Sequence, residues 1–60
     1  MKLKSEYYKG HKVNFVYRLL KENKQEVLAQ WKIRNRLLEV AGNTKNDAYT
    51  RIKRIIDQVV

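Results

Sequence analysis

The sequence predicts a mainly helical fold, a small compact helical domain with three helices at about 12–22, 24–41 and 45–59. Apolar side chains recur every three or four residues through the second and third of these segments, which is the spacing of an amphipathic helix. Residues that commonly cap a helix stand just before both segments, and a glycine separates them. Proline is absent, so nothing in the chain forces an interruption.

Length and composition limit the organisation. With 60 residues the chain has room for one domain, expected at 12–60 behind a basic N-terminal arm at 1–11. A domain of this size buries only about 60% of the surface of its unfolded chain, so its core is marginal. Cysteine is absent and histidine occurs once, so neither a disulfide, a metal site nor a cofactor is expected. A homodimer is expected to supply the missing stability.

Residues 12–22 fit two kinds of structure. At helical spacing four apolar side chains share one face: Val13, Val16, Tyr17 and Leu20. At period two, Val13, Phe15 and Tyr17 alternate with polar neighbours, and these residue types favour strands. The helix is preferred, and the strand stays open as the alternative.

Residues 24–41 carry the longest helical pattern. Asn23 stands three residues before Glu26, the spacing of a capping box, and Gly42 follows as a helix-ending residue. The apolar positions form two stripes: Val27, Trp31, Leu38 and Ala41 in one, Ala29, Ile33, Leu37 and Val40 in the other. A helix with two apolar stripes packs on two sides, so it is either the central helix or one shared with a second copy.

Residues 45–59 predict a helix with a single buried face. Thr44 and Asp47 have capping-box spacing, and an acid suits the positive N-terminal end of the helix dipole. One face is apolar: Ala48, Tyr49, Ile52, Ile55, Ile56 and Val59.

The charge of the chain favours a polyanionic partner. Fourteen Lys and Arg residues stand against six Asp and Glu, a formal net charge of +8. A surface this positive favours nucleic acid, with DNA expected ahead of RNA. Basic groups stand on the middle segment (Lys32, Arg34, Arg36) and on the last helix (Lys45, Arg51, Lys53, Arg54). Arginine can bind phosphate or guanine with two hydrogen bonds, so a small DNA-binding transcriptional regulator is the function expected.

The stretch GNTKNDAYTRI at 42–52 resembles the junction between the two helices of ribbon-helix-helix repressors. In that family a glycine, a capping Ser or Thr and an acid precede an apolar helix. EVL at 26–28 resembles the start of the family's first helix, and KVNFVYR at 12–18 resembles its strand. The resemblance implies an alternative fold, an obligate dimer with a strand at 12–18 followed by two helices.

The same resemblance implies roles for individual residues. The bases would be faced by Lys12, Asn14 and Arg18, and Thr44 with its neighbouring amides would hold a phosphate. Two features depart from the family: Val16 stands where a polar side chain is expected, and residues 18–42 form a longer segment than the family has.

A non-enzymatic protein-binding module or inhibitor is the rival function. Trp31, Ile33 and Leu37 would form its apolar helix face, because tryptophan in an apolar patch is a common interface anchor. An enzyme is not expected: His11 stands alone among lysines, and two distant glycines make no phosphate-binding loop. No membrane span or signal peptide is recognised, so no membrane partner is expected and the cytoplasm is the expected location.

Overall fold

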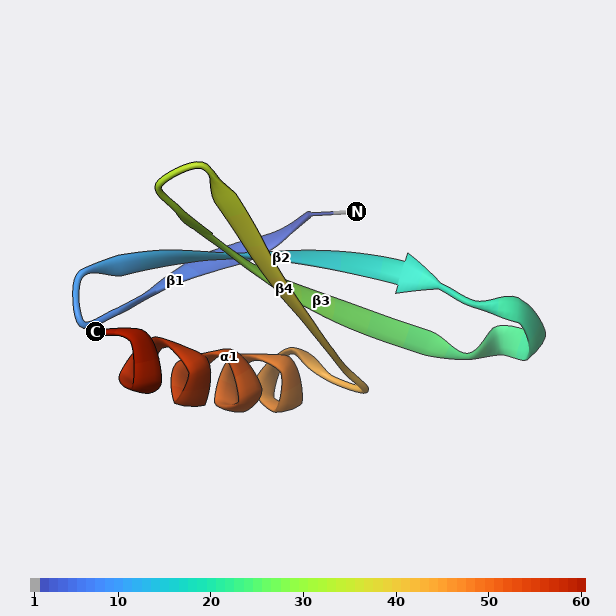
Figure 1. The fold of residues 1–60 in the computed structure, drawn as a ribbon. Coiled ribbons are helices and arrows are strands. Elements are labelled where there is room, and N and C mark those ends of the chain that lie inside the picture. The colour runs from blue at the N-terminus through green and yellow to red at the C-terminus, as the bar shows by residue number, and fades with distance from the viewer. Residues whose placement is uncertain (1) are drawn as a thin grey trace.

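The computed structural model describes residues 2–60, which form a four-stranded antiparallel sheet and one helix (Figure 1). The elements are β1 (Lys2–Tyr8), β2 (His11–Leu19), a short 3-10 turn (Lys21–Asn23), β3 (Gln25–Ile33), β4 (Arg36–Gly42) and α1 (Lys45–Val59). The strands lie in chain order, β1-β2-β3-β4, so each pairs with the next through a hairpin. The helix covers one face of this sheet and leaves the other uncovered (Figure 1).

The prediction of a mainly helical fold is wrong, because the segments at 12–22 and 24–41 are strands rather than helices. The strand-then-two-helices alternative also fails, since only α1 is an α-helix among residues 2–60. In β3 the buried side chains are Val27, Ala29 and Trp31, at every second position, which is the period of a strand. The last helix is observed at the predicted residues, Lys45–Val59.

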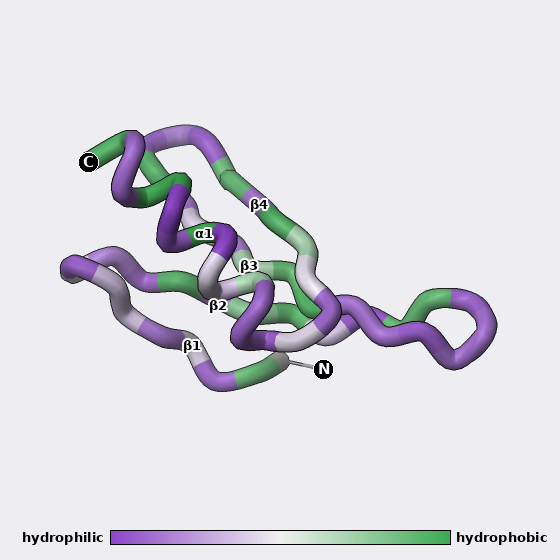
Figure 2. The backbone as a smooth tube through the Cα atoms, turned by 90° about the horizontal axis from the view of Figure 1, so that it is seen from below, coloured by the Kyte–Doolittle hydropathy of each residue, from purple (hydrophilic) through white to green (hydrophobic). Residues whose placement is uncertain are grey.

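The hydrophobic core lies between α1 and the two central strands. Its fully or nearly fully buried members are Val13, Phe15, Val27, Ala29 and Trp31 from the sheet, and Ala48, Ile52 and Ile56 from the helix. The three helical residues are spaced four apart, so they form one apolar stripe along α1. Hydrophilic and hydrophobic segments accordingly alternate along the helix in Figure 2. The two apolar stripes that suggested a shared middle helix are therefore side chains of β3 and β4.

Two tight turns close the outer hairpins at the same end of the sheet. Lys9 and Gly10 have φ of 51° and 81°, and positive φ at both central residues is the property of a type I′ hairpin turn. Arg34 takes the corresponding strained conformation between β3 and β4, with φ of 53°. Residues 2–8, expected as part of a basic arm, thus form an edge strand, while Met1 lies outside the described residues.

The hairpin of β2 and β3 projects beyond the rest of the domain (Figure 1). The pairing of β1 with β2 ends at Val16, and that of β4 with β3 ends at Val27, so neither outer strand accompanies the tip. The loop is closed by a hydrogen bond from the Leu20 amide to the Lys24 carbonyl oxygen at 2.7 Å. Asn23, expected as a helix cap, lies inside this loop with φ of 62°. Figure 2 shows the tip as largely hydrophilic apart from one short apolar stretch.

The junction between β4 and α1 is tight. The Thr44 hydroxyl accepts a hydrogen bond from the Asp47 amide at 3.1 Å, which caps the helix as predicted. Gly42 ends β4 against the first turn of α1, where a Cβ atom on Gly42 would lie 2.5 Å from the Ala48 nitrogen. The glycine is therefore required for close packing between strand and helix rather than as a helix-ending residue.

Candidate nucleic-acid interface

The uncovered face of the sheet collects polar and basic side chains from the two central strands. Side chains alternate between the faces of a sheet, so the neighbours of the buried residues point away from α1. They are Lys12, Asn14, Val16 and Arg18 from β2, and Glu26, Leu28, Gln30 and Lys32 from β3. The three residues that were expected to face bases therefore lie on one open surface, which we call the open face.

A row of polar side chains crosses the open face, with one member from each strand. The Ser5 hydroxyl of β1 donates to the Asn14 side-chain oxygen at 2.7 Å. Asn14 is the register partner of Gln30 on β3, and Gln30 in turn is the partner of Glu39 on β4. The Gln30 amide donates to a Glu39 carboxylate oxygen at 2.8 Å. Hydrogen bonds to the outer strands thus fix the orientation of both central amides.

Cations flank this polar row. Lys12 precedes Asn14 by two residues on β2, and Lys32 follows Gln30 by two on β3, so both exposed lysines lie at the same end of the open face. At the other end, the Arg18 guanidinium pairs with Glu26, its register partner. A shallow hollow of about 310 Å³ opens over the row, and Ser5, Lys12, Asn14 and Gln30 are among the residues that line it.

Half-buried apolar side chains lie between the polar row and the Arg18–Glu26 pair. Val16 is the register partner of Leu28, and Leu28 is the partner of Ala41. Together these positions give the open face a narrow apolar strip that can contact the methyl group of a thymine or another apolar surface.

The last helix carries the other basic residues that were expected to bind nucleic acid. They lie on the opposite side of the molecule from the open face, and most of them make internal contacts. Lys45 pairs with Glu6 at 3.5 Å and stands 5.0 Å from the centre of the Phe15 ring. Arg51 donates to the Ala41 carbonyl oxygen at 3.0 Å. Lys53 lies over the Tyr49 ring at 4.6 Å. Internal partners therefore occupy three of the four cations proposed on this helix.

Arg54 is exposed, and within the described residues it makes no hydrogen bond, ion pair or ring contact, unlike the other three helical cations. It shares the outer surface of α1 with the exposed acids Asp47 and Asp57. Charges of both signs on that surface weaken its attraction for a polyanion, as Glu26 and Glu39 do on the open face. The seven proposed nucleic-acid-binding residues thus separate into two surfaces, and within the described residues internal partners hold all of them except Lys12 on the open face and Arg54 on the helix.

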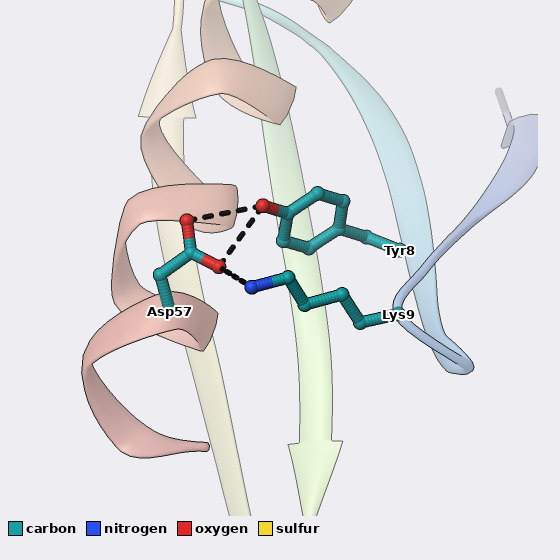
Figure 3. Close-up of polar contacts among 3 residues, drawn as sticks. All are labelled: Tyr8, Lys9 and Asp57. Atoms are coloured by element: carbon teal, nitrogen blue, oxygen red, sulfur yellow. Dashed lines mark hydrogen bonds and ion pairs between the residues drawn. The ribbon is translucent and has the colours of Figure 1, made fainter.

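An ion-pair cluster ties the C-terminal part of α1 to the β1–β2 turn (Figure 3). The Lys9 ammonium and the Tyr8 hydroxyl both contact the Asp57 carboxylate, the former at 2.7 Å and the latter at 2.9 and 3.0 Å. Hydrogen bonds from Lys9 and Tyr8 lower the pKa of Asp57. The hydrogen bond to Asp57 raises the pKa of Lys9 and of Tyr8. At neutral pH Asp57 and Lys9 are therefore charged, and Tyr8 keeps its proton and donates it to Asp57. The cluster holds the helix to the turn and offers no group for acid–base chemistry.

The residues of the expected protein interface do not form one patch. Trp31 is only 1% exposed and lies in the core, where the His11 ring meets it edge-on with centroids 5.3 Å apart. Ile33 packs against the core on the helix side, whereas Leu37 is 59% exposed. Lys32 is the register partner of Leu37, which places Leu37 on the open face.

Sequence reasoning missed Ser5, Gln30 and Glu39 as site residues. In the expected middle helix, Gln30 belongs to neither apolar stripe, and that helix predicts no relation between Gln30 and Asn14. The usable signal was the alternation of Val27, Ala29 and Trp31, which places the intervening residues on the face opposite the core.

No protein-family model, curated protein or solved structure is significantly similar to the chain. Within residues 2–60, no helix combines the length and the apolar character that crossing a bilayer requires. No group of three or more His, Cys, Asp or Glu side chains gathers as a metal site in the same described region.

Proposed function

We propose that the protein binds duplex DNA through the open face of its sheet, as a small regulator of transcription. The observation that carries the proposal is the arrangement of Lys12, Asn14 and Arg18 from β2 beside Gln30 and Lys32 from β3. Amides and basic groups are the side chains that hydrogen-bond base edges and phosphates in a major groove.

The shape of the hairpin supports this use. The major groove of B-DNA, about 12 Å wide, admits a two-stranded ribbon, and neighbouring strands lie about 4.8 Å apart. Beyond Val16 and Val27 the ribbon of β2 and β3 has no flanking strand. This tip, which includes Arg18, can therefore enter a groove without a collision from β1 or β4. By contrast, Asn14 and Gln30 lie where the sheet is four strands wide, and together with the neighbouring Lys12 and Lys32 they would face the duplex across that broader surface.

Phosphate contacts would supply most of the affinity. Lys12 and Lys32 lie at one end of the two amides, and the exposed lysines of the β2–β3 loop, Lys21 and Lys24, add positive charge at the tip beyond the other end. Each lysine that neutralises a phosphate releases condensed counterions, so binding weakens steeply as salt rises. The net charge of +8 favours encounter with any duplex before a base is read.

Duplex DNA fits this surface better than duplex RNA. The major groove of A-form RNA is deep and narrow, so a sheet face cannot reach the base edges there.

A salt titration on a duplex of generic sequence tests the proposal. Lys12→Ala is expected to weaken binding and to reduce its salt dependence. Arg54→Ala is the control, because it removes one exposed positive charge from the opposite side of the molecule. Equal losses in both variants would contradict the assignment to the open face.

A further inference from the structure

We infer that the β3–β4 turn binds the minor groove of A·T-rich DNA, with the Arg34 side chain inserted into the groove. The inference rests on the proposed DNA-binding function and adds to it a second point of contact and a sequence preference. It starts from the shape of the β3–β4 hairpin at the end opposite the β2–β3 loop (Figure 1).

The end of the β3–β4 hairpin projects as a two-stranded ribbon. The pairing of β2 with β3 ends at Asn14 and Gln30, whereas the pairing of β3 with β4 continues to Ile33 and Arg36. Among the described residues, the part of β3 beyond Gln30 therefore pairs with β4 alone. Figure 1 shows this turn standing away from the β1–β2 turn, so the narrow end of the hairpin is open to a partner.

The turn carries two cations that have no internal partner. Arg34 and Arg36 are both exposed, and within residues 2–60 neither makes a hydrogen bond, an ion pair or a contact with an aromatic ring. Together with Ile33 and with Val59 of α1, they line a hollow of about 540 Å³. The end of the helix therefore leaves space around both guanidinium groups.

The β1–β2 turn offers a comparison. Lys9 there has nearly the same backbone conformation as Arg34, with φ of 51° against 53°. This left-handed conformation is unfavourable for a residue with a side chain. The Lys9 ammonium contacts the Asp57 carboxylate at 2.7 Å, so its charge is used inside the protein. Arg34 has the same conformation without such a contact, which leaves its guanidinium available to an external anion.

A single arginine at the end of a narrow turn suits the minor groove. That groove is about 6 Å wide in B-DNA, so it excludes a ribbon but admits one extended side chain. In A·T-rich tracts it is narrower and its negative potential is stronger, which attracts an inserted cation. Guanidinium is more weakly hydrated than ammonium, so arginine loses less than lysine on leaving water. Guanine places an amino group in this groove, where it obstructs insertion.

The place of the turn beside the open face agrees with this use. Lys32 stands two residues before Arg34, at the end of the open face where Lys12 also lies. A strand rises about 3.3 Å per residue, so Arg34 lies about 7 Å beyond Lys32. The two lysines can then contact the phosphates that separate the grooves, with the open face over the major groove and the turn in the minor groove.

The experiment compares three duplexes of equal length, with A·T, inosine·C and G·C cores, by fluorescence anisotropy at fixed salt. Inosine lacks the amino group of guanine but keeps its major-groove acceptors, so the inosine·C core has an A·T-like minor groove and a G·C-like major groove. The wild-type protein is expected to bind the A·T and inosine·C cores about tenfold more tightly than the G·C core, within the usual range for one base pair.

Two substitutions of Arg34 separate groove insertion from charge and from folding. Arg34→Lys keeps the charge, so it should lose most of the preference while keeping the affinity for the G·C core. Arg34→Gly should lose the preference and still melt no lower than the wild type, because glycine adopts positive φ readily. Lys32→Ala is the matched control and should weaken all three complexes by the same factor.

The outcomes distinguish the inference from the function on which it rests. Equal binding to all three cores, or binding of inosine·C at the level of G·C, overturns the minor-groove assignment. An Arg34→Gly variant that keeps the preference overturns the role of Arg34. In each case the DNA-binding proposal stands if Lys12→Ala weakens every complex, whereas an absence of binding to any duplex overturns both.

Discussion

The Asp57 carboxylate accepts a hydrogen bond from the Tyr8 hydroxyl across 49 residues of sequence, at 2.9 Å. Asp57 lies in the last turns of α1, where a negative charge is unfavourable because the helix dipole is negative at that end. The Lys9 ammonium, 2.7 Å from the same carboxylate, offsets this effect. The cluster therefore fastens the end of the helix to the β1–β2 turn.

Asp57→Asn should lower the melting temperature at neutral pH, because asparagine can accept from Tyr8 but cannot pair with Lys9. The pKa of Asp57 is lowered by folding, so its stabilisation is present above its ordinary value of 3.8 and is lost as pH falls through the folded pKa. The pKa of Lys9 is raised, so its contribution is complete below 10.5 and is lost as pH rises through the folded pKa.

The measurement is the melting temperature of both proteins as a function of pH. Their difference should be largest near neutrality and shrink at both the acid and the alkaline extremes. Glu22→Gln, at the exposed β2–β3 turn, is the control and should show no such profile. A constant difference at all pH values would mean that the charge of Asp57 does not matter.

Gly42→Ala should destabilise the domain by about 1–3 kcal/mol, the usual cost of overpacking. The new Cβ atom would lie 2.5 Å from the Ala48 backbone nitrogen, so the strand and the helix must move apart. Gly10→Ala is the comparison, since its Cβ meets nothing within 4 Å and only the positive φ of 81° is unfavourable. Urea unfolding measures both, and a larger loss for Gly10→Ala would contradict the close approach at Gly42.

Thr44→Ala should cost about 1 kcal/mol of stability, the typical value for the loss of an N-cap. The Thr44 hydroxyl satisfies the Asp47 amide at 3.1 Å, and alanine leaves that donor without its acceptor. Thr44→Ser keeps the hydroxyl and should stay close to the wild type. If both variants unfold at the same urea concentration as the wild type, the cap contributes nothing measurable.

Trp31 should behave as a core residue in solution. It is the single tryptophan of the chain and is 1% exposed, so its fluorescence should be blue-shifted and poorly quenched by acrylamide. Both properties should change together when the protein unfolds. Emission typical of exposed tryptophan in the folded state would instead favour a role for Trp31 in binding a protein partner.

The C-terminal third of the fold follows from its sequence in a simple way. The single apolar face of residues 45–59 and the cap at Thr44 correspond to the observed helix, whereas Gly42 ends a strand and not the helix predicted before it. These signals are local, because they depend on hydrogen bonds and side chains within one turn of helix.

A strand at 12–18 stayed open as an alternative, but the strands at 25–33 and 36–42 were missed because their patterns are imperfect. Leu28 and Leu37 place apolar side chains on the open face, so the alternation is broken and helical spacing fits equally well. The β3–β4 turn is built from Arg34 and Asn35 without glycine, so the usual hairpin signal is absent. Only strand pairing, a non-local property, decides between the two readings.

The candidate site was predictable only in part. Lys12, Asn14 and Arg18 were named through the resemblance of residues 12–18 to the strand of ribbon-helix-helix repressors, and they share the open face. Gln30 and Glu39 were not found, since their relation to Asn14 depends on the register of three strands. The register of a strand pair is set by the core and the turns together, so it could not be predicted from the sequence of any one strand alone.

The salt dependence of duplex binding tests the central claim most directly. The affinity of the wild-type protein for a generic duplex should fall steeply from about 50 mM to about 200 mM salt. Lys12→Ala and Lys32→Ala should each reduce the slope of log affinity against log salt by about one, whereas Arg54→Ala should leave it unchanged. Failure to bind at the lowest salt, or a reduced slope for Arg54→Ala alone, would contradict DNA binding through the open face.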